Sequence, residues 1–200
     1  MRIAILGGSF DPPHRGHVLI AKRLIKLLNF DEVWFMLCSE HPFNEKLSPQ
    51  NSRFEMAKYL ENKSIKISDF ELNKKGTSYT VDTLSALSKM FYKNQFFWII
   101  GSDQVRNFTK WKNWQEIIKK FKLIIVPRSH IGEVQVNLKE YILKKISRSR
   151  NIIVVDKKKF PLICISSTNI RKNIKEGKSI LNMVSKKIEN YIIKHKLYLK

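Results

Sequence analysis

Residues 7–17 read GGSFDPPHRGH and stand between a short apolar run at 2–6 and an amphipathic stretch at 16–28. The apolar run is typical of a buried strand, and in 16–28 the apolar side chains recur at helical spacing. The two glycines let the backbone approach a phosphate closely, and the two prolines stiffen the return of the chain. A strand, this loop and a helix start together predict an anion site in an open parallel sheet.

His14 and His17 are the residues of this loop whose side chains can take part in catalysis. They lie three residues apart at the expected helix start, so both imidazoles can point to one side. Two imidazoles can donate hydrogen bonds to charge that builds on a leaving pyrophosphate. The loop is neither GxGxxG nor GxxxxGK[ST], so the usual dinucleotide and P-loop sites do not fit. A metal site is the alternative reading of paired histidines, but a third ligand is not apparent nearby.

The rest of the chain alternates between strand and helix patterns. Strands are predicted at 33–38, 65–67, 96–100, 123–126 and 152–155, and helices at 53–61, 80–92, 114–121 and 138–146, with a helical end at 168–176 and 184–196. Asn29 is expected to end the first helix, and Ser78 or Thr80 to cap the helix at 80–92. This alternation predicts an α/β fold, a Rossmann-like open parallel sheet with helices on both faces. One domain is expected over 1–200, with 166–200 as its helical C-terminal part.

Composition narrows the class of protein. The 200 residues carry a formal net charge of +21, which favours polyanionic partners. The lysines are spread along the chain, so a solvated basic surface is favoured over a dedicated nucleic-acid face. We find no apolar run long enough for a bilayer and no signal-peptide pattern, and therefore expect a cytoplasmic protein without membrane contact. Cys38 and Cys164 lie in apolar stretches without a CxxC pattern, which predicts two buried thiols.

The loop at 7–17 resembles the GG[ST]FDPxHxGH signature of the bacterial nicotinate-nucleotide adenylyltransferases, part of the HxGH nucleotidyltransferase superfamily. Residues 165–171, ISSTNIR, resemble the second signature of the class, ISSTxIR. By pattern alone this second segment is a hydroxyl-rich cap before a helix, with a basic residue near its start. The resemblance implies catalysis by His14, His17 and Arg171. It implies ATP binding by Gly7, Gly8, Ser9, Phe10, His14, His17, Gly101, Asp103, Ile165, Ser166, Ser167, Thr168 and Arg171.

Three further segments resemble the same family. GSD at 101–103 resembles its GxD element, which implies Asp103 beside the ribose or the metal-bound phosphates, although a turn-forming aspartate is the alternative. WKNW at 111–114 resembles its tryptophan segment, in which Trp111 would stack on the pyridine ring, whereas Trp114 is expected to pack in the core. SYTVDTL at 78–84 resembles SYTxDTL, which implies that main-chain groups around Thr80 meet the pyridine carboxylate.

The loop after the second strand departs from the family pattern. The family has a PPHK-like stretch there, and this chain reads HPFNEK at 41–46. The position of the phosphate-binding lysine falls on Asn44, with Lys46 as a second candidate. The expected mononucleotide-binding residues are Ser9, Asn44, Lys46, Tyr79, Thr80 and Trp111.

The resemblance implies transfer of the adenylyl group of ATP to nicotinate mononucleotide, with Mg2+ held mainly by the ATP phosphates rather than by protein ligands. Nicotinamide mononucleotide or another phosphate ester is the first alternative acceptor. A basic nucleic-acid-binding protein on this fold is a second alternative. A class I aminoacyl-tRNA synthetase fits poorly, because the chain lacks a KMSKS-like lysine loop. A homo-oligomer is left open.

Overall fold

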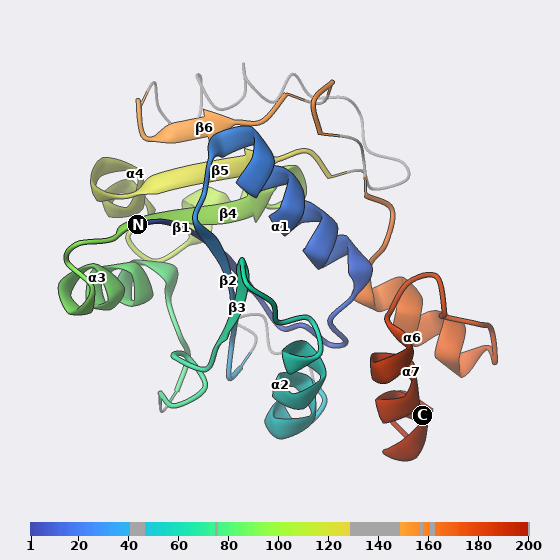
Figure 1. Ribbon diagram of the computed structural model, residues 1–200. Coiled ribbons are helices and arrows are strands. Elements are labelled where there is room, and N and C mark those ends of the chain that lie inside the picture. Colours follow the sequence, from blue (N-terminus) through green and yellow to red (C-terminus); the bar gives the residue numbers. More distant parts are fainter. Residues whose placement is uncertain (41–46, 75, 129–148, 157, 161–162, 200) are drawn as a thin grey trace. The chain divides into compact units, whose positions relative to one another are not determined.

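The computed structural model describes residues 1–40, 47–74, 76–128, 149–156, 158–160 and 163–199. Within these residues a six-stranded sheet has the order β3-β2-β1-β4-β5-β6 (Figure 1). The strands are β1 Arg2–Gly8, β2 Glu32–Leu37, β3 Ile65–Ser68, β4 Gln95–Gly101, β5 Lys122–Val126 and β6 Ile152–Val154. The helices are α1 Arg15–Leu28, α2 Gln50–Lys58, α3 Thr80–Met90, the 3-10 helix η1 Ser102–Lys110, α4 Trp114–Lys120, α6 Ser167–Lys175 and α7 Lys186–Lys194. The predicted α/β fold with an open parallel sheet is confirmed.

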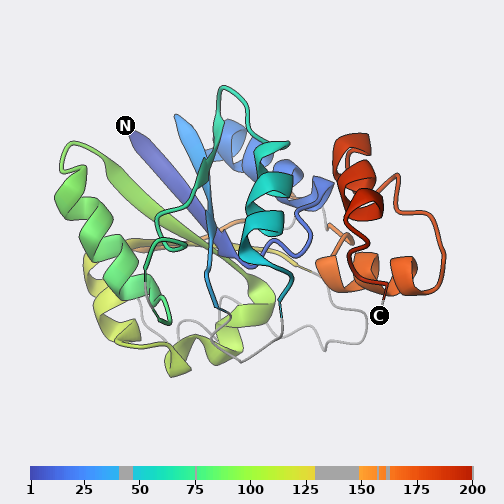
Figure 2. The same cartoon turned by 90° about the horizontal axis from the view of Figure 1, so that it is seen from below.

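One compact unit consists of Met1–Leu6 and Tyr79–Cys164. In it β1 pairs in parallel with β4, β4 with β5, and β5 with β6. After their first residues, Gln95 and Lys122, strands β4 and β5 carry apolar side chains that are buried on both sides of the sheet. Helices α3 and α4 contact each other and pack on β4 and β5, respectively (Figure 2). This unit places the carboxyl end of β4 directly before η1.

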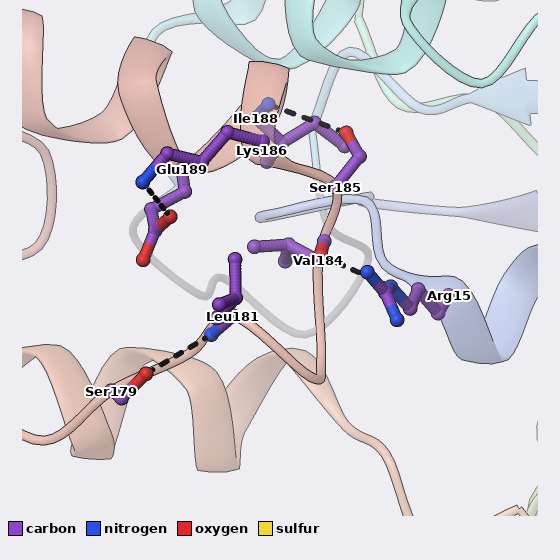
Figure 3. Close-up of polar contacts among 8 residues, drawn as sticks. All are labelled: Arg15, Ser179, Leu181, Val184, Ser185, Lys186, Ile188 and Glu189. Atoms are coloured by element: carbon purple, nitrogen blue, oxygen red, sulfur yellow. Dashed lines mark hydrogen bonds and ion pairs between the residues drawn. The ribbon is translucent and has the colours of Figure 1, made fainter.

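The other compact unit consists of Gly7–Ser78 and Ile165–Lys200. In it β2 and β3 pair in parallel, and α1 and α2 both contact β2. The C-terminal helices pack against this early part of the chain, since α7 contacts α2 and the ring of Tyr191 lies edge-on to that of Tyr59 at 6.3 Å. At the start of α1, Arg15 donates from Nε to the Val184 carbonyl at 3.1 Å (Figure 3). Residues 165–199 therefore help to hold the loop that precedes α1.

Most predicted elements are present with shifted ends. Asn29 ends α1 in the left-handed conformation, as expected. The helix predicted at 53–61 instead spans Gln50–Lys58, because Pro49 fixes an extended residue from which the helix starts. The cap expected from Ser78 or Thr80 is wrong, since Tyr79 is the N-cap of α3 and makes no side-chain cap bond. Strand β1 extends beyond the apolar run at 2–6 and includes Gly7 and Gly8.

Three further predictions, or omissions, concern a 3-10 helix, the helix at 138–146 and the two cysteines. The 3-10 helix η1 was not predicted, because SDQVRNFTK lacks a helical run of apolar residues. The helix predicted at 138–146 lies outside the described residues. The prediction of two buried thiols is wrong for Cys164, which is exposed in the segment before α6. Cys38 is half-buried at the end of β2, where burial raises the pKa of its thiol to about 11.

A search of the described residues for membrane spans finds no helix that is both long and apolar enough to cross a bilayer. The cytoplasmic location and the single domain over 1–200 stay predictions.

Candidate nucleotide-binding site

The two histidines of the loop lie face to face at the start of α1. His14 is the N-cap, in an extended conformation, and its backbone N–H donates to Nδ1 of His17 at 3.1 Å. The ring centroids are 3.7 Å apart and the ring planes are 23° from parallel. Because Nδ1 of His17 accepts a hydrogen bond, the neutral ring carries its proton on Nε2 and can donate from there. The two imidazoles therefore lie together, as their three-residue spacing predicted.

Phe10 supports this pair from the core. It adopts a left-handed backbone conformation, with φ of 49°, and its side chain is 2% exposed. Its ring lies 4.6 Å from that of His17 and 5.3 Å from that of Phe35 on β2. The side chain of Phe10 therefore acts as packing behind His17, so any contact of Phe10 with a nucleotide would come from its main chain.

The second signature is hydrogen-bonded to the first. Ser167 donates from Oγ to the Pro12 carbonyl at 2.9 Å, and Arg171 donates from Nη1 to the Asp11 carbonyl at 2.8 Å. These partners are 155 and 160 residues apart in the sequence. Both Ser167 and Arg171 were expected to bind ATP, and the structure adds that they hold the main chain of the loop at 7–17. The guanidinium has five N–H donors, so one such bond leaves others for a ligand.

The start of α6 has the hydroxyl cap that its sequence predicts. Ser166 is the N-cap, and its side chain accepts a hydrogen bond from the Asn169 N–H at 3.1 Å. Thr168 is exposed in the first turn, and Ile165 is half-buried just before the helix. The exposed helix start, with its partial positive charge, is suited to an anion beside the loop.

Asp11 is a buried acidic residue whose role the sequence did not indicate. It is 2% exposed, yet its carboxylate is satisfied on both oxygens. Oδ2 accepts from the Ser48 N–H at 3.0 Å, and Oδ1 accepts from the Tyr198 hydroxyl at 2.6 Å. Burial, followed by the negative charge of Asp11, raises the pKa of Tyr198 far above its usual range. The Tyr198 hydroxyl is therefore a permanent donor to this carboxylate.

Arg53 is the second functional candidate that sequence reasoning missed. It is 1% exposed and donates to four main-chain carbonyls: to Ser48 from Nε, to Ser9 and Cys38 from Nη1, and to Ser39 from Nη2, at 2.8–3.1 Å. The arginine thus joins the loop after β1 to the loop after β2. The only sequence signal was an arginine in the first turns of a helix, which is commonplace.

The remaining predicted residues belong to the unit that contains β4. A Cβ at Gly101 would overlap the Asp103 carboxylate, so a larger residue at this position would have to displace that side chain. Asp103 lies 3.6 Å from Nη1 of Arg128. The hydroxyl of Ser102 donates to the Arg128 carbonyl and accepts from its N–H, at 3.1 and 2.9 Å. The GSD segment is therefore held firmly at the end of β4.

A cation lies next to the predicted pyridine contacts. Lys112 places Nζ 4.6 Å from the ring centroid of Tyr79 and 2.9 Å from the Asp82 carboxylate. Trp111 is half-buried, with its ring 5.4 Å from that of Phe108. Sequence reasoning passed over Lys112, although it stands inside the WKNW segment.

The predicted site residues therefore fall into two groups, each within its own unit. The histidine loop is joined to the start of α6 in one unit, and Tyr79, Gly101, Asp103 and Trp111 lie in the other, as does Thr80, the first residue of α3. Trp114, expected in the core, is half-buried like Trp111 and lies beside Phe108. Asn44 and Lys46 lie outside the described residues. Among the described side chains no three of His, Cys, Asp or Glu gather as metal ligands.

The fold and the paired histidines after β1 define a nucleotidyltransferase class. In agreement, the model of the cytidylyltransferase-like family matches residues 5–173. A relative from Clostridium acetobutylicum, described as a probable nicotinate-nucleotide adenylyltransferase, is 38% identical over 200 residues, with 98% of each chain covered. A relative with the same description from Cytophaga hutchinsonii is 35% identical over 202 residues, covering 99% of this chain and 98% of its own. The chain belongs to the nicotinate-nucleotide adenylyltransferase family.

The fold also agrees with a solved structure. The nicotinic acid mononucleotide adenylyltransferase of Plasmodium falciparum, complexed with NaAD, superposes with a TM-score of 0.78 at 23% identity. The match covers 98% of this chain and 97% of that one. It supports the architecture described above.

Proposed function

We propose that the chain transfers the adenylyl group of ATP to nicotinate mononucleotide, giving nicotinate adenine dinucleotide and pyrophosphate. The observation that carries this proposal is the stacked pair His14 and His17 at the N-terminus of α1, in a loop fixed from several sides. The descriptions of relatives that match almost the whole chain support the choice of reaction.

The reaction needs alignment and charge neutralisation more than a base. The mononucleotide phosphate is already anionic and attacks the α-phosphorus of ATP in line, so a new P–O bond forms as the bond to pyrophosphate breaks. Negative charge on the triphosphate would be stabilised by His14, the Nε2–H of His17 and the guanidinium of Arg171. The N-terminus of α1 adds main-chain donors on the same side. Neither a covalent intermediate nor a protein nucleophile is required.

Nucleotidyltransferases of this family generally use a divalent metal ion. For this chain we infer Mg2+, which would screen the charge of the ATP phosphates and be held mainly by them.

The acceptor is assigned to the unit with α3. Main-chain groups at the start of this helix, around Thr80, would meet the pyridine carboxylate, and the indole of Trp111 would stack on the ring. Lys112 lies beside Tyr79 and is paired with the Asp82 carboxylate. The choice of nicotinate over nicotinamide therefore rests on the descriptions of the relatives.

A pyrophosphate-release assay tests the proposal. The protein is incubated with ATP, Mg2+ and either mononucleotide, then with both in competition. We expect release with nicotinate mononucleotide and its preferential use in the mixture. Preferential use of nicotinamide mononucleotide would transfer the assignment to that acceptor. A protein that releases pyrophosphate with neither compound would contradict adenylyl transfer to a pyridine mononucleotide.

A further inference from the structure

The segment after α7 turns back toward the histidine loop. The helix ends at Lys194, Lys196 takes a left-handed conformation with φ of 50°, and Leu197 donates its N–H to the Ile192 carbonyl at 3.0 Å. Tyr198 follows with φ of 66°. Left-handed backbone is unfavourable for a bulky residue, so a tertiary contact must stabilise it. The observed contact is the hydrogen bond to Asp11.

Asp11 is the point at which three parts of this unit meet. Its carboxylate binds Tyr198 from the C-terminal segment and the Ser48 N–H from the loop before α2, and its carbonyl binds Arg171 of α6. A buried carboxylate is costly unless its lone pairs are satisfied, so loss of one donor would shift the residue or admit water. The Tyr198 hydroxyl supplies the shortest of these bonds, at 2.6 Å.

Asp11 stands three residues before His14, and two prolines separate them. Because each proline fixes its φ, this short link has little freedom to absorb a shift at Asp11. His14 in turn donates its N–H to Nδ1 of His17, and this bond selects the ring tautomer that donates from Nε2. A displacement at Asp11 therefore reaches both imidazoles.

We propose that Tyr198 is a positioning residue for adenylyl transfer: through Asp11 it fixes the loop that orients His14 and His17. Tyr198 acts through its hydrogen bond to Asp11, so its effect passes through the loop. The expected effect on turnover is the kinetic part of this inference, and it rests on the proposed function. The effect on the orientation of the two imidazoles is the structural part, and it does not.

The first test removes only the hydroxyl. Tyr198→Phe is compared with Tyr191→Phe, which alters a tyrosine of α7 that packs against Tyr59 and His195. We expect Tyr198→Phe to lower kcat about tenfold, the scale of one charge-assisted hydrogen bond, with KM for ATP within about twofold of wild type. Tyr191→Phe should keep its kcat. Both are assayed well below their melting temperatures, so that a loss of folded protein does not enter.

A double-mutant cycle shows whether the effect passes through Asp11. If it does, Tyr198→Phe should lower kcat much less in an Asp11→Ala background, which has no acceptor for the hydroxyl, than in the wild type. Additive effects in the cycle, or a Tyr198→Phe kcat equal to that of Tyr191→Phe, would overturn the proposal.

Histidine 15N NMR gives a readout that needs no activity. In the wild type we expect the His17 signals of a single tautomer protonated on Nε2, and in Tyr198→Phe a mixture of tautomers or broadened signals. Unchanged His17 signals would sink the structural part. A wild type with this NMR signature but no pyrophosphate release would refute the proposed function alone.

Discussion

At the residue scale, the site depends on buried polar groups that bind the main chain. Arg53 and Asp11 are almost fully buried, and each ties together loops that follow different strands. His14 and His17 then take their orientation from this fixed backbone. His14 and His17 are thus held in place by Arg53 and Asp11, and the sequence did not indicate that either of these two residues has this role.

Removal of the His17 imidazole should severely reduce turnover. His17→Ala deletes the proposed Nε2–H donor and the acceptor of the His14 N–H, so we expect kcat to fall by about a hundredfold or more. His195→Ala is the control, because His195 lies at the end of α7 against Tyr191. The pyrophosphate assay provides the measurement, and near-normal turnover of His17→Ala would remove this residue from the mechanism.

Arg53 should contribute more to stability than any surface arginine. Arg53→Met leaves four carbonyls without their donor, and we expect the free energy of unfolding to fall by about 3 kcal/mol or more. Arg150→Met, at an exposed position, should change it by less than about 0.5 kcal/mol. Urea unfolding of both variants measures the difference, and equal midpoints would show that the arginine network is not stabilising.

At the element scale, α6 and α7 are built alike but serve different purposes. Each begins with a serine N-cap, Ser166 or Ser185, whose hydroxyl accepts a main-chain N–H three residues on. The start of α6 adjoins the histidine loop, to which Ser167 donates a hydrogen bond. The start of α7 follows Val184, whose carbonyl binds Arg15 at the beginning of α1 (Figure 3).

The two caps form a matched pair for separating stability from binding. Ser166→Ala and Ser185→Ala should each lower the free energy of unfolding by about 1 kcal/mol, the usual effect of losing an N-cap hydroxyl. Only Ser166→Ala should also raise KM for ATP, because its helix start is the proposed phosphate contact. Unfolding curves and initial rates test this, and an equal KM for ATP in the two variants would argue against a nucleotide at α6.

At the scale of the whole molecule, segments that are far apart in the sequence pack together in one compact unit. The C-terminal 36 residues, 165–200, belong to the same compact unit as residues 7–78. Stability is therefore expected to respond to groups buried by this long-range packing. Cys38 belongs to this unit; its thiol lies just after β2, and its carbonyl binds the buried Arg53.

Stability should fall at alkaline pH in part through this thiol. Its pKa rises from 9.0 to about 11 on folding, so between these values the folded chain retains a proton that the unfolded chain releases. The associated stability is complete below pH 9 and is lost as pH rises toward 11, by about 2–3 kcal/mol. Urea unfolding across this range should show a shallower decline for Cys38→Ala than for wild type or Cys164→Ala. Parallel declines in all three would contradict the effect.

The sequence by itself determined most of the strands and helices, the paired histidines and the serine cap of α6. These features depend on local spacing: apolar period, residue separation along a helix, and capping chemistry. Element ends, such as the start of α2 at Gln50, were less well predicted, because one proline outweighed the apolar pattern. Local signals of this kind can be read without knowledge of the fold.

Only the tertiary structure decided what holds the site. It showed that Ser167 and Arg171 bind the carbonyls of the first loop, that Arg53 joins two loops, and that Tyr198 reaches Asp11 from 187 residues away. None of these partners can be identified from spacing, because any buried carbonyl can satisfy a donor once folding brings the two together. The proposed catalytic groups can thus be identified from short sequence motifs, whereas their orientation depends on contacts that only the folded chain makes.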